Sequence, residues 1–179
     1  RFSKIKCPNK NFYVQDISKP WNFFDDSIKQ KYNKKLEPKI YDMILLNLSV
    51  HYAFQDNNGI IYLMNEINKR SDSRTNLMIS FIDMDVLFKD RDNIKFNDGG
   101  YMKKMERNGM YHQLRYYYPW RHNYPMTEPL ISKRELIMYL NGLGWYQKDE
   151  YQRIYPDMED GYKELSESIT RLSFIKLNI

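Results

Sequence analysis

Two kinds of apolar pattern alternate along the first half of the chain. The runs YDMILL at residues 41–46 and NLMISFID at residues 76–83 lack the alternation of a half-exposed strand. Such runs predict strands that are covered on both faces of a sheet. Residues 59–70 instead place apolar side chains at helical spacing and end on Lys69 and Arg70, which predicts a helix.

Two further elements are predicted nearer the start of the chain. NFYVQD, at residues 11–16, alternates weakly and ends on an acid, which indicates a short strand. A basic helix is predicted to stop before Pro38. Residues 11–82 then follow the order strand, helix, strand, helix, strand, which is typical of a parallel sheet with right-handed crossovers.

The second half of the chain has a different character. Residues 111–120, YHQLRYYYPW, predict a Tyr-rich strand, and residues 121–129, RHNYPMTEP, predict a loop bounded by prolines. An acidic stretch over residues 149–160 precedes a last predicted strand, ITRLSFIKLNI, at residues 169–179.

A helix is predicted between the proline-bounded loop and the acidic stretch. Ser132 and Glu135 have the spacing of a capping box, so Ser132 is expected to precede the first turn. Gly142 or Gly144 is expected to end the helix.

Composition indicates one globular domain over residues 1–179, since 42% of the residues are hydrophobic and 16% are aromatic. The net charge of +5 is concentrated in residues 1–40, which hold ten Lys and Arg against four acids. This basic end suits a phosphate-bearing partner and equally suits solubility alone.

Cys7 is the only cysteine, which excludes an internal disulfide and favours a reducing compartment. No run approaches the ~20 apolar residues of a membrane span.

Polar residues follow several of the predicted strands. Asp16, Asn47 and the pair Asp83 and Asp85 fall at strand ends, where ligands bind in open α/β sheets. Asp16 could accept from an exocyclic amine such as that of adenine, or could cap the next turn. No phosphate-binding loop is present, and three His with one Cys give no zinc spacing.

The segment HYAF, at residues 51–54, is separated by four residues from the strand predicted at residues 41–46. His51, Tyr52 and Phe54 there have two readings when taken alone. In the first reading they are core residues, and the histidine makes its hydrogen bonds within the protein. In the second they are an imidazole and two aromatic rings that frame a ligand.

Four segments together resemble the mRNA cap guanine-N7 methyltransferases, most closely the capping enzymes of poxviruses and asfarviruses. LLNLSVHYAF resembles the family's Gln-containing motif that ends in His-Tyr-Ser-Phe, and YPMTEPLISKRELIMYLNGLGW resembles its PMTEY segment and following helix. MISFIDMDVLF and VQDISK resemble two of its strand ends. The resemblance implies the later portion of a Rossmann-like class I methyltransferase fold, with an antiparallel C-terminal part of the sheet.

The resemblance implies S-adenosyl-L-methionine as the cofactor. Asp16 matches the acid that binds the cofactor's adenine. Asn47 replaces the family's Gln, and with Leu48 and Ser49 it would line the methionine and ribose side. Tyr52 matches the tyrosine near the methyl end. The family's glycine-rich cofactor loop is expected upstream of Arg1, and the start without a methionine indicates a piece of a longer protein. We expect these 179 residues alone to bind the cofactor weakly.

The resemblance also implies a site for the guanosine cap. His51 matches the histidine that faces the cap guanine, and Glu128 matches the carboxylate that holds its Watson–Crick edge. Phe54 and Tyr124 are candidates to stack on or enclose the base, as Tyr52 is. The family's cap-contacting Tyr in the last strand has no counterpart here, because the chain offers Thr170 or Arg171.

The implied reaction transfers a methyl group to N7 of guanine, which has a free lone pair and no proton to lose. His51 and Tyr52 are therefore expected to position the reactants, with no residue acting as a general base. Implied partners are the capped 5' end of mRNA, triphosphatase and guanylyltransferase domains in the same chain, and a stimulatory subunit. The expected location is the cytoplasm, at a viral replication site or in a virion. Two alternatives stay open: an inert regulatory or RNA-binding half-domain, and a methyltransferase that acts on another nucleoside.

Overall fold

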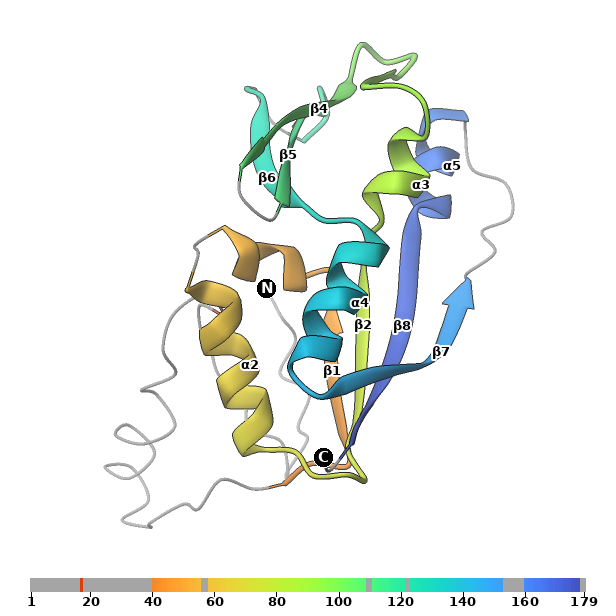
Figure 1. The fold of residues 1–179 in the computed structure, drawn as a ribbon. Coiled ribbons are helices and arrows are strands. Elements are labelled where there is room, and N and C mark those ends of the chain that lie inside the picture. The colour runs from red at the N-terminus through yellow and green to blue at the C-terminus, as the bar shows by residue number, and fades with distance from the viewer. Residues whose placement is uncertain are drawn as a thin grey trace, which may run out of the picture.

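The computed structural model describes residue 17 and residues 40–55, 58–108, 111–121, 123–152 and 160–177. The predicted strand at residues 11–16 and the basic helix before Pro38 lie outside this part of the chain. The described residues form two four-stranded sheets, and the small sheet stands beyond one end of the main sheet (Figure 1).

The main sheet combines a parallel pair of strands with two antiparallel ones. Its strands, in sheet order, are β1 (Met43–Asn47), β2 (Asn76–Ile82), β8 (Ile169–Lys176) and β7 (Trp145–Gln152). β1 and β2 are parallel, whereas β8 pairs antiparallel with both β2 and β7. The strands predicted from the three apolar runs are confirmed, and so is the antiparallel C-terminal part of the sheet. β7 occupies part of the acidic stretch, where no strand was predicted.

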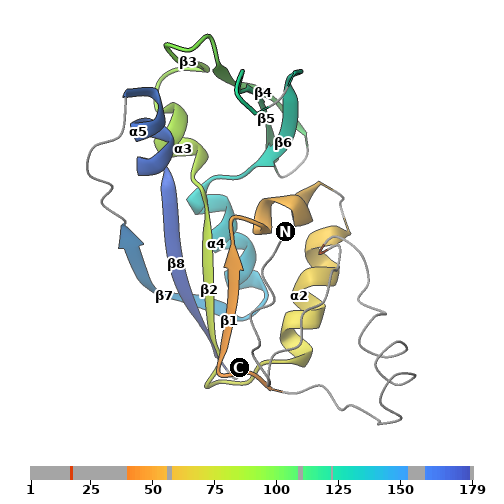
Figure 2. The ribbon, with the colours of Figure 1, turned by 180° about the vertical axis from the view of Figure 1, so that it is seen from behind.

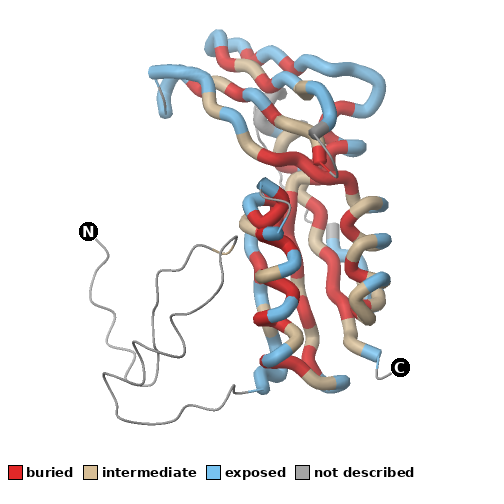
Figure 3. The backbone as a smooth tube through the Cα atoms, turned by 60° about the vertical axis from the view of Figure 1, so that its left-hand side comes forward, coloured by how far each residue is buried: buried red, intermediate tan, exposed pale blue. Residues whose placement is uncertain are grey.

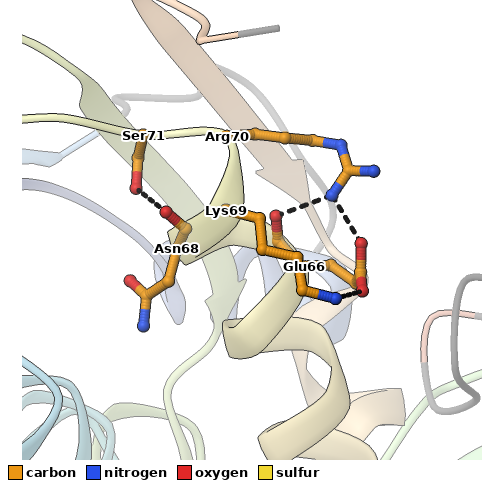
Figure 4. A network of polar contacts seen from close by, with 5 residues as sticks. All are labelled: Glu66, Asn68, Lys69, Arg70 and Ser71. Atoms are coloured by element: carbon orange, nitrogen blue, oxygen red, sulfur yellow. Dashed lines mark hydrogen bonds and ion pairs between the residues drawn. The ribbon is translucent and has the colours of Figure 1, made fainter. Parts of the chain in front are cut away.

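Helix α2 (Gly59–Lys69) makes the crossover between β1 and β2, as predicted. Its end is fixed by a compact polar network (Figure 4). The Arg70 guanidinium donates to the Glu66 carbonyl at 3.0 Å and pairs with the Glu66 carboxylate, while Lys69 Nζ lies 2.7 Å from the same carboxylate. The Tyr41 amide donates to the Arg70 carbonyl at 3.0 Å, which ties the end of α2 to the start of β1.

β1 is covered on one face and not on both. Leu46 is buried against α2, whereas Met43 and Leu45 are 57% and 61% exposed. The view from behind shows β1, β2 and β8 with no described helix in front of them (Figure 2). β1 is the edge strand of the described sheet, and alternation along a strand turns every second side chain to this open face. The expectation of two covered faces is therefore wrong for the described residues.

Helix α4 (Lys133–Gly142) packs on the covered face and begins as predicted. Ser132 Oγ accepts from the Glu135 amide at 3.2 Å, and the Ser132 amide donates to the Glu135 carboxylate at 3.4 Å. These two bonds confirm the capping box. Gly144, at φ 82°, takes the left-handed conformation after the helix, where a glycine is least strained. Trp145, the next residue, is fully buried, and its indole N–H donates to Asn68 Oδ1 at 2.9 Å.

The small sheet is antiparallel throughout. Its strands, in sheet order, are β3 (Asn93–Lys95), β4 (Tyr101–Asn108), β5 (Tyr111–Tyr117) and β6 (Met126–Leu130). The predicted Tyr-rich strand is confirmed as β5. β6 begins within the segment predicted as a proline-bounded loop, so this prediction is wrong for residues 126–129 and is confirmed for residues 123–125. Pro129 is tolerated because β6 is an edge strand, where one missing backbone donor need not break a ladder.

Asp83 joins the two sheets where β2 ends. Its carboxylate caps α3 (Met84–Phe88) by accepting from the Asp85 amide at 3.1 Å, and it also accepts from the Lys133 amide at 3.2 Å. Its backbone bridges to Ile131, and its amide donates to the Ser168 carbonyl at 2.8 Å, between α5 (Asp160–Glu167) and β8. Burial continues from the strands into this junction (Figure 3). Asp83 therefore acts as a structural cap.

We expect Asp83→Ala to lower the free energy of unfolding by about 2 kcal/mol, because the backbone amides of Asp85 and Lys133 lose their acceptor. Burial raises the pKa of Asp83 and so disfavours its charged form. Asp83→Asn, which keeps an uncharged acceptor, should therefore lose less than half as much. Urea unfolding measures both, with exposed Asp90→Ala as the control that should change by less than about 0.5 kcal/mol. Equal stability of Asp83→Ala and the wild type would contradict the role of Asp83 in linking the two sheets.

Candidate functional site

The turn that leaves β1 is held by β2. Ser80 Oγ donates to Asn47 Oδ1 at 2.5 Å, and the Leu48 amide donates to the Ser80 carbonyl at 2.8 Å. Leu48 has φ 49°, which is uncommon for a residue with a side chain. Ser49 follows and makes no side-chain capping bond. The sequence therefore places an amide, a strained backbone unit and a hydroxyl at the carboxyl end of a sheet strand.

A short 3-10 helix, η2 (Val50–Phe54), begins directly after this turn. Val50, Ala53 and Phe54 anchor it in the core of the main sheet. Phe54 is 3% exposed and packs edge-on to Tyr139, with ring centroids 5.9 Å apart. The ring of Phe54 thus belongs to the core here and presents no face to a base.

Three side chains, two from η2 and one from β5, meet at one carboxylate. Glu128, on β6, accepts from the hydroxyls of Tyr52 and Tyr116, both at 2.7 Å and both at Oε1. His51 Nε2 lies 3.7 Å from Glu128 Oε2, and the rings of His51 and Tyr52 are 4.2 Å apart. Tyr52 and Glu128 are 76 positions apart in the chain, so only the packing of η2 against β6 brings them together.

Both phenols are donors at neutral pH. Burial and the hydrogen bond to Glu128 raise the pKa of Tyr52 to about 12. The same causes raise the pKa of Tyr116. The two residues differ in exposure, since Tyr52 is 39% exposed and Tyr116 is 6% exposed. Tyr116 is thus a fixed support of the carboxylate, whereas Tyr52 stands at its open side.

His51 is a buried, uncharged neighbour of the same carboxylate. Burial lowers the pKa of His51, and the negative charge of Glu128 opposes that shift only in part. Its Nε2 atom is buried and has no hydrogen-bond partner among the described residues. An unpaired buried polar atom is costly, so its place beside Glu128 Oε2 marks this position as one suited to a ligand.

The remaining residues to place are Tyr124, Asp16 and the two candidates in the last strand. Tyr124 is 64% exposed in the loop before β6, and Asp16 lies outside the described residues. Of the two residues that replace the family's last-strand Tyr, Thr170 is buried. Arg171 borders a hollow of about 310 Å³ on the open face of the main sheet, together with Asn47 and Ser80.

Sequence reasoning missed Tyr116 as a site residue. It is the first of three consecutive tyrosines, and no motif distinguishes it from its neighbours. Strand alternation is the pattern that could have identified Tyr116. On β5, Leu114 pairs with Glu128, and Tyr116 is two positions further along, so it lies on the face of the sheet that carries Glu128.

Two absences apply to the described part of the chain. It holds no group of three His, Cys, Asp or Glu side chains that could bind a metal ion. None of its helices combines the length and the apolar character that crossing a membrane requires.

Comparisons with known proteins identify the fold. No protein-family model and no curated protein matches the chain. A solved S-adenosylmethionine-dependent methyltransferase from Clostridium acetobutylicum ATCC 824 matches 92% of this chain at 10% identity and a TM-score of 0.50. The PH0226 protein from Pyrococcus horikoshii OT3 matches 94% at 10% identity and a TM-score of 0.54. The chain spans 63% of the length of each. It therefore has the α/β fold of class I S-adenosylmethionine-dependent methyltransferases.

We expect His51 to titrate below its ordinary pKa of 6.5. Because the folded state disfavours the imidazolium, the unfolded state binds more protons, and the free energy of unfolding should fall as the pH drops below 6.5. Urea unfolding at about pH 7.5 and about pH 5.5 should show this loss, and it should shrink in His51→Gln. Nuclear magnetic resonance titration of the ring proton measures the pKa directly.

The matched control is His112→Gln on β5, which should leave the pH difference caused by His51 in place. A His51 ring that titrates above 6.5 would contradict the dominance of burial over the charge of Glu128.

Proposed function

We propose that this chain is part of an S-adenosylmethionine-dependent methyltransferase that methylates N7 of the guanosine cap of mRNA. The observation that carries the proposal is the meeting of His51, Tyr52 and Glu128 at the carboxyl end of β1. The resemblance assigns His51 and Glu128 to the cap guanine and Tyr52 to the methyl end of the cofactor, and methyl transfer requires these positions to lie in contact. The methyltransferase fold supports the cofactor.

The turn after β1 fits one side of the cofactor. Ser80 holds the oxygen of Asn47, which leaves the amide N–H groups of Asn47 to donate to a ligand's carboxylate or hydroxyl. Leu48 and Ser49 continue the same edge, at the end of the sheet where open α/β folds bind ligands. Asp16 would accept from the adenine amine. The cofactor supplies an electrophilic methyl group carried on a sulfonium.

Glu128 is suited to the Watson–Crick edge of guanine. That edge offers two donors side by side, the N1–H and the 2-amino group, whereas adenine offers an unprotonated N1. Oε1 of Glu128 already accepts from two phenols, so a two-point contact needs one of them to leave. Exposed Tyr52 is the one that can move, and buried Tyr116 keeps the carboxylate in place.

The residues present suit catalysis by positioning. N7 has no proton to lose, and His51 is buried and uncharged, so it acts through shape and through the hydrogen-bonding capacity of Nε2. Holding N7 in line with the methyl donor can supply ~7–11 kcal/mol of the barrier. Methylation gives the base a positive charge, which the Glu128 carboxylate stabilises.

The partners follow from the same proposal. Capped RNA is the substrate, and the resemblance adds triphosphatase and guanylyltransferase domains in the same protein together with a stimulatory subunit.

Glu128→Gln should weaken binding of the unmethylated cap dinucleotide GpppA, because the glutamine amide would face a donor edge with a donor of its own. Loss of a buried charge-assisted contact costs roughly 2–5 kcal/mol, or roughly 30-fold to several-thousand-fold in affinity. Isothermal titration calorimetry measures the change. Exposed Glu167→Gln is the charge-matched control, and ApppA is the control ligand.

Unchanged affinity of Glu128→Gln for GpppA would refute the assignment of Glu128. In the full-length natural protein, free GpppA should also compete against transfer of a labelled methyl group to capped RNA. Methyl transfer that GpppA does not inhibit would indicate a methyltransferase acting on another nucleoside. Absence of methyl transfer would indicate an inert scaffold.

Tyr116→Phe should weaken cap binding, whereas Tyr52→Phe should not. Tyr116→Phe removes the fixed support of a charged acceptor and should lower the affinity for GpppA roughly 10-fold. Tyr52→Phe removes a contact that guanine must displace, so affinity should be unchanged or higher. Calorimetry tests both, with Tyr146→Phe on β7 as the control. The reverse order of the two effects would contradict the displacement of Tyr52.

A further inference from the structure

The small sheet has a second face, on the side away from Glu128. Alternation along β4 and β5 turns Met102, Leu114 and Tyr116 toward the core that includes α3, and their neighbours to the other side. The residues turned outward border a groove of about 630 Å³. The groove is lined by three cations and by no acid. We call it the outer groove; its cations are Lys95, Lys103 and Arg115.

These cations carry an electrostatic cost within the protein. Lys103 and Arg115 are directly opposite each other on β4 and β5, an arrangement in which like charges destabilise a sheet. All three cations are exposed, and none has an ion-pair partner in the part of the chain that the structure describes. Lys104, the next residue on β4, faces the other way and pairs with Asp92 at 3.0 Å. The outer groove thus keeps its positive charge available to an external anion.

Two aromatic rings lie beside the cations. Tyr101 and Tyr117 form the neighbouring cross-strand pair, with ring centroids 6.1 Å apart, and Lys95 pairs with Tyr101 from β3. Both rings are half-buried, so each keeps part of its surface open. Sheet surfaces that bind single-stranded nucleic acid combine cations for the phosphates with aromatic rings on which bases stack.

We infer that the outer groove binds single-stranded RNA without reading its sequence. Lys95, Lys103 and Arg115 would contact successive phosphates, and Tyr101 and Tyr117 would stack against bases. An acidic protein would match the charge but would leave the two rings without a role. The outer groove and Glu128 lie on opposite faces of the sheet, and this inference does not depend on the proposed methyl transfer.

The test is fluorescence anisotropy with a labelled, uncapped, single-stranded RNA of about 12 nucleotides. Lys103→Gln/Arg115→Gln should bind at least about 10-fold more weakly than the wild type. Because two phosphate contacts are lost, the slope of log affinity against log salt should fall in magnitude by about 1.4. Arg134→Gln/Lys148→Gln removes the same charge from exposed positions elsewhere and should bind like the wild type. An equal loss in both double variants would overturn the assignment.

The rings are tested separately from the charges. Tyr117→Leu should weaken RNA binding at least about 5-fold, while Tyr117→Phe should restore it, because a phenyl ring stacks as well. Equal affinity of the leucine and phenylalanine variants would overturn the role of stacking. Displacement of the RNA by polyglutamate as readily as by unlabelled RNA would overturn the choice of nucleic acid as the partner.

A third comparison separates this inference from the proposed function. GpppA binding should be unaffected in Lys103→Gln/Arg115→Gln, and uncapped RNA binding should be unaffected in Glu128→Gln. Loss of uncapped RNA binding in Glu128→Gln would contradict a separate outer groove, whatever the outcome for the cap.

Discussion

The carboxylate of Asp83 holds the two sheets in one arrangement. It accepts from the first turn of α3 and from the first residue of α4, and its backbone meets Ile131 just after β6. A buried carboxylate is tolerated when hydrogen bonds compensate for its lost hydration, and both of its partners here are backbone amides. The chain passes twice between the sheets, and both passages run through this joint. The angle of the small sheet on the main sheet is set there.

The candidate site depends on that angle. Tyr52 comes from η2 and Glu128 from the edge of the small sheet, and their hydrogen bond of 2.7 Å links η2, which follows β1 of the main sheet, to the small sheet. Burial keeps both phenols protonated and His51 uncharged, so the three side chains that meet Glu128 are neutral, and Arg121 is a cation near the two phenols. A carboxylate held by neutral side chains favours a ligand with adjacent N–H donors. Guanine has that edge, and the charge it gains on N7 methylation is of the favourable sign.

One strand serves both faces of the small sheet. Tyr116 and Tyr118 on either side of Tyr117 are buried, and Tyr116 supports Glu128, while Tyr117 lies beside Tyr101 on the face of the sheet that carries the outer groove. The run of three tyrosines is therefore two inward residues and one outward residue, as the pleat of a strand requires. The high tyrosine content reflects this double use, because a phenol can fill a core, donate a hydrogen bond or stack on a base.

The sequence by itself determined the elements whose signals are local. The apolar runs specified β1, β2 and β8, helical spacing specified α2, and Ser132 with Glu135 specified the start of α4, because each pattern lies within one element. A motif resemblance also pointed to His51, Tyr52 and Glu128. Tertiary structure alone decided that β6 is a strand, that β1 has one open face, and that Tyr116 supports Glu128. These features depend on pairing between distant segments, and the hydrogen bond from Tyr52 to Glu128 across 76 positions has no periodicity from which it could be read.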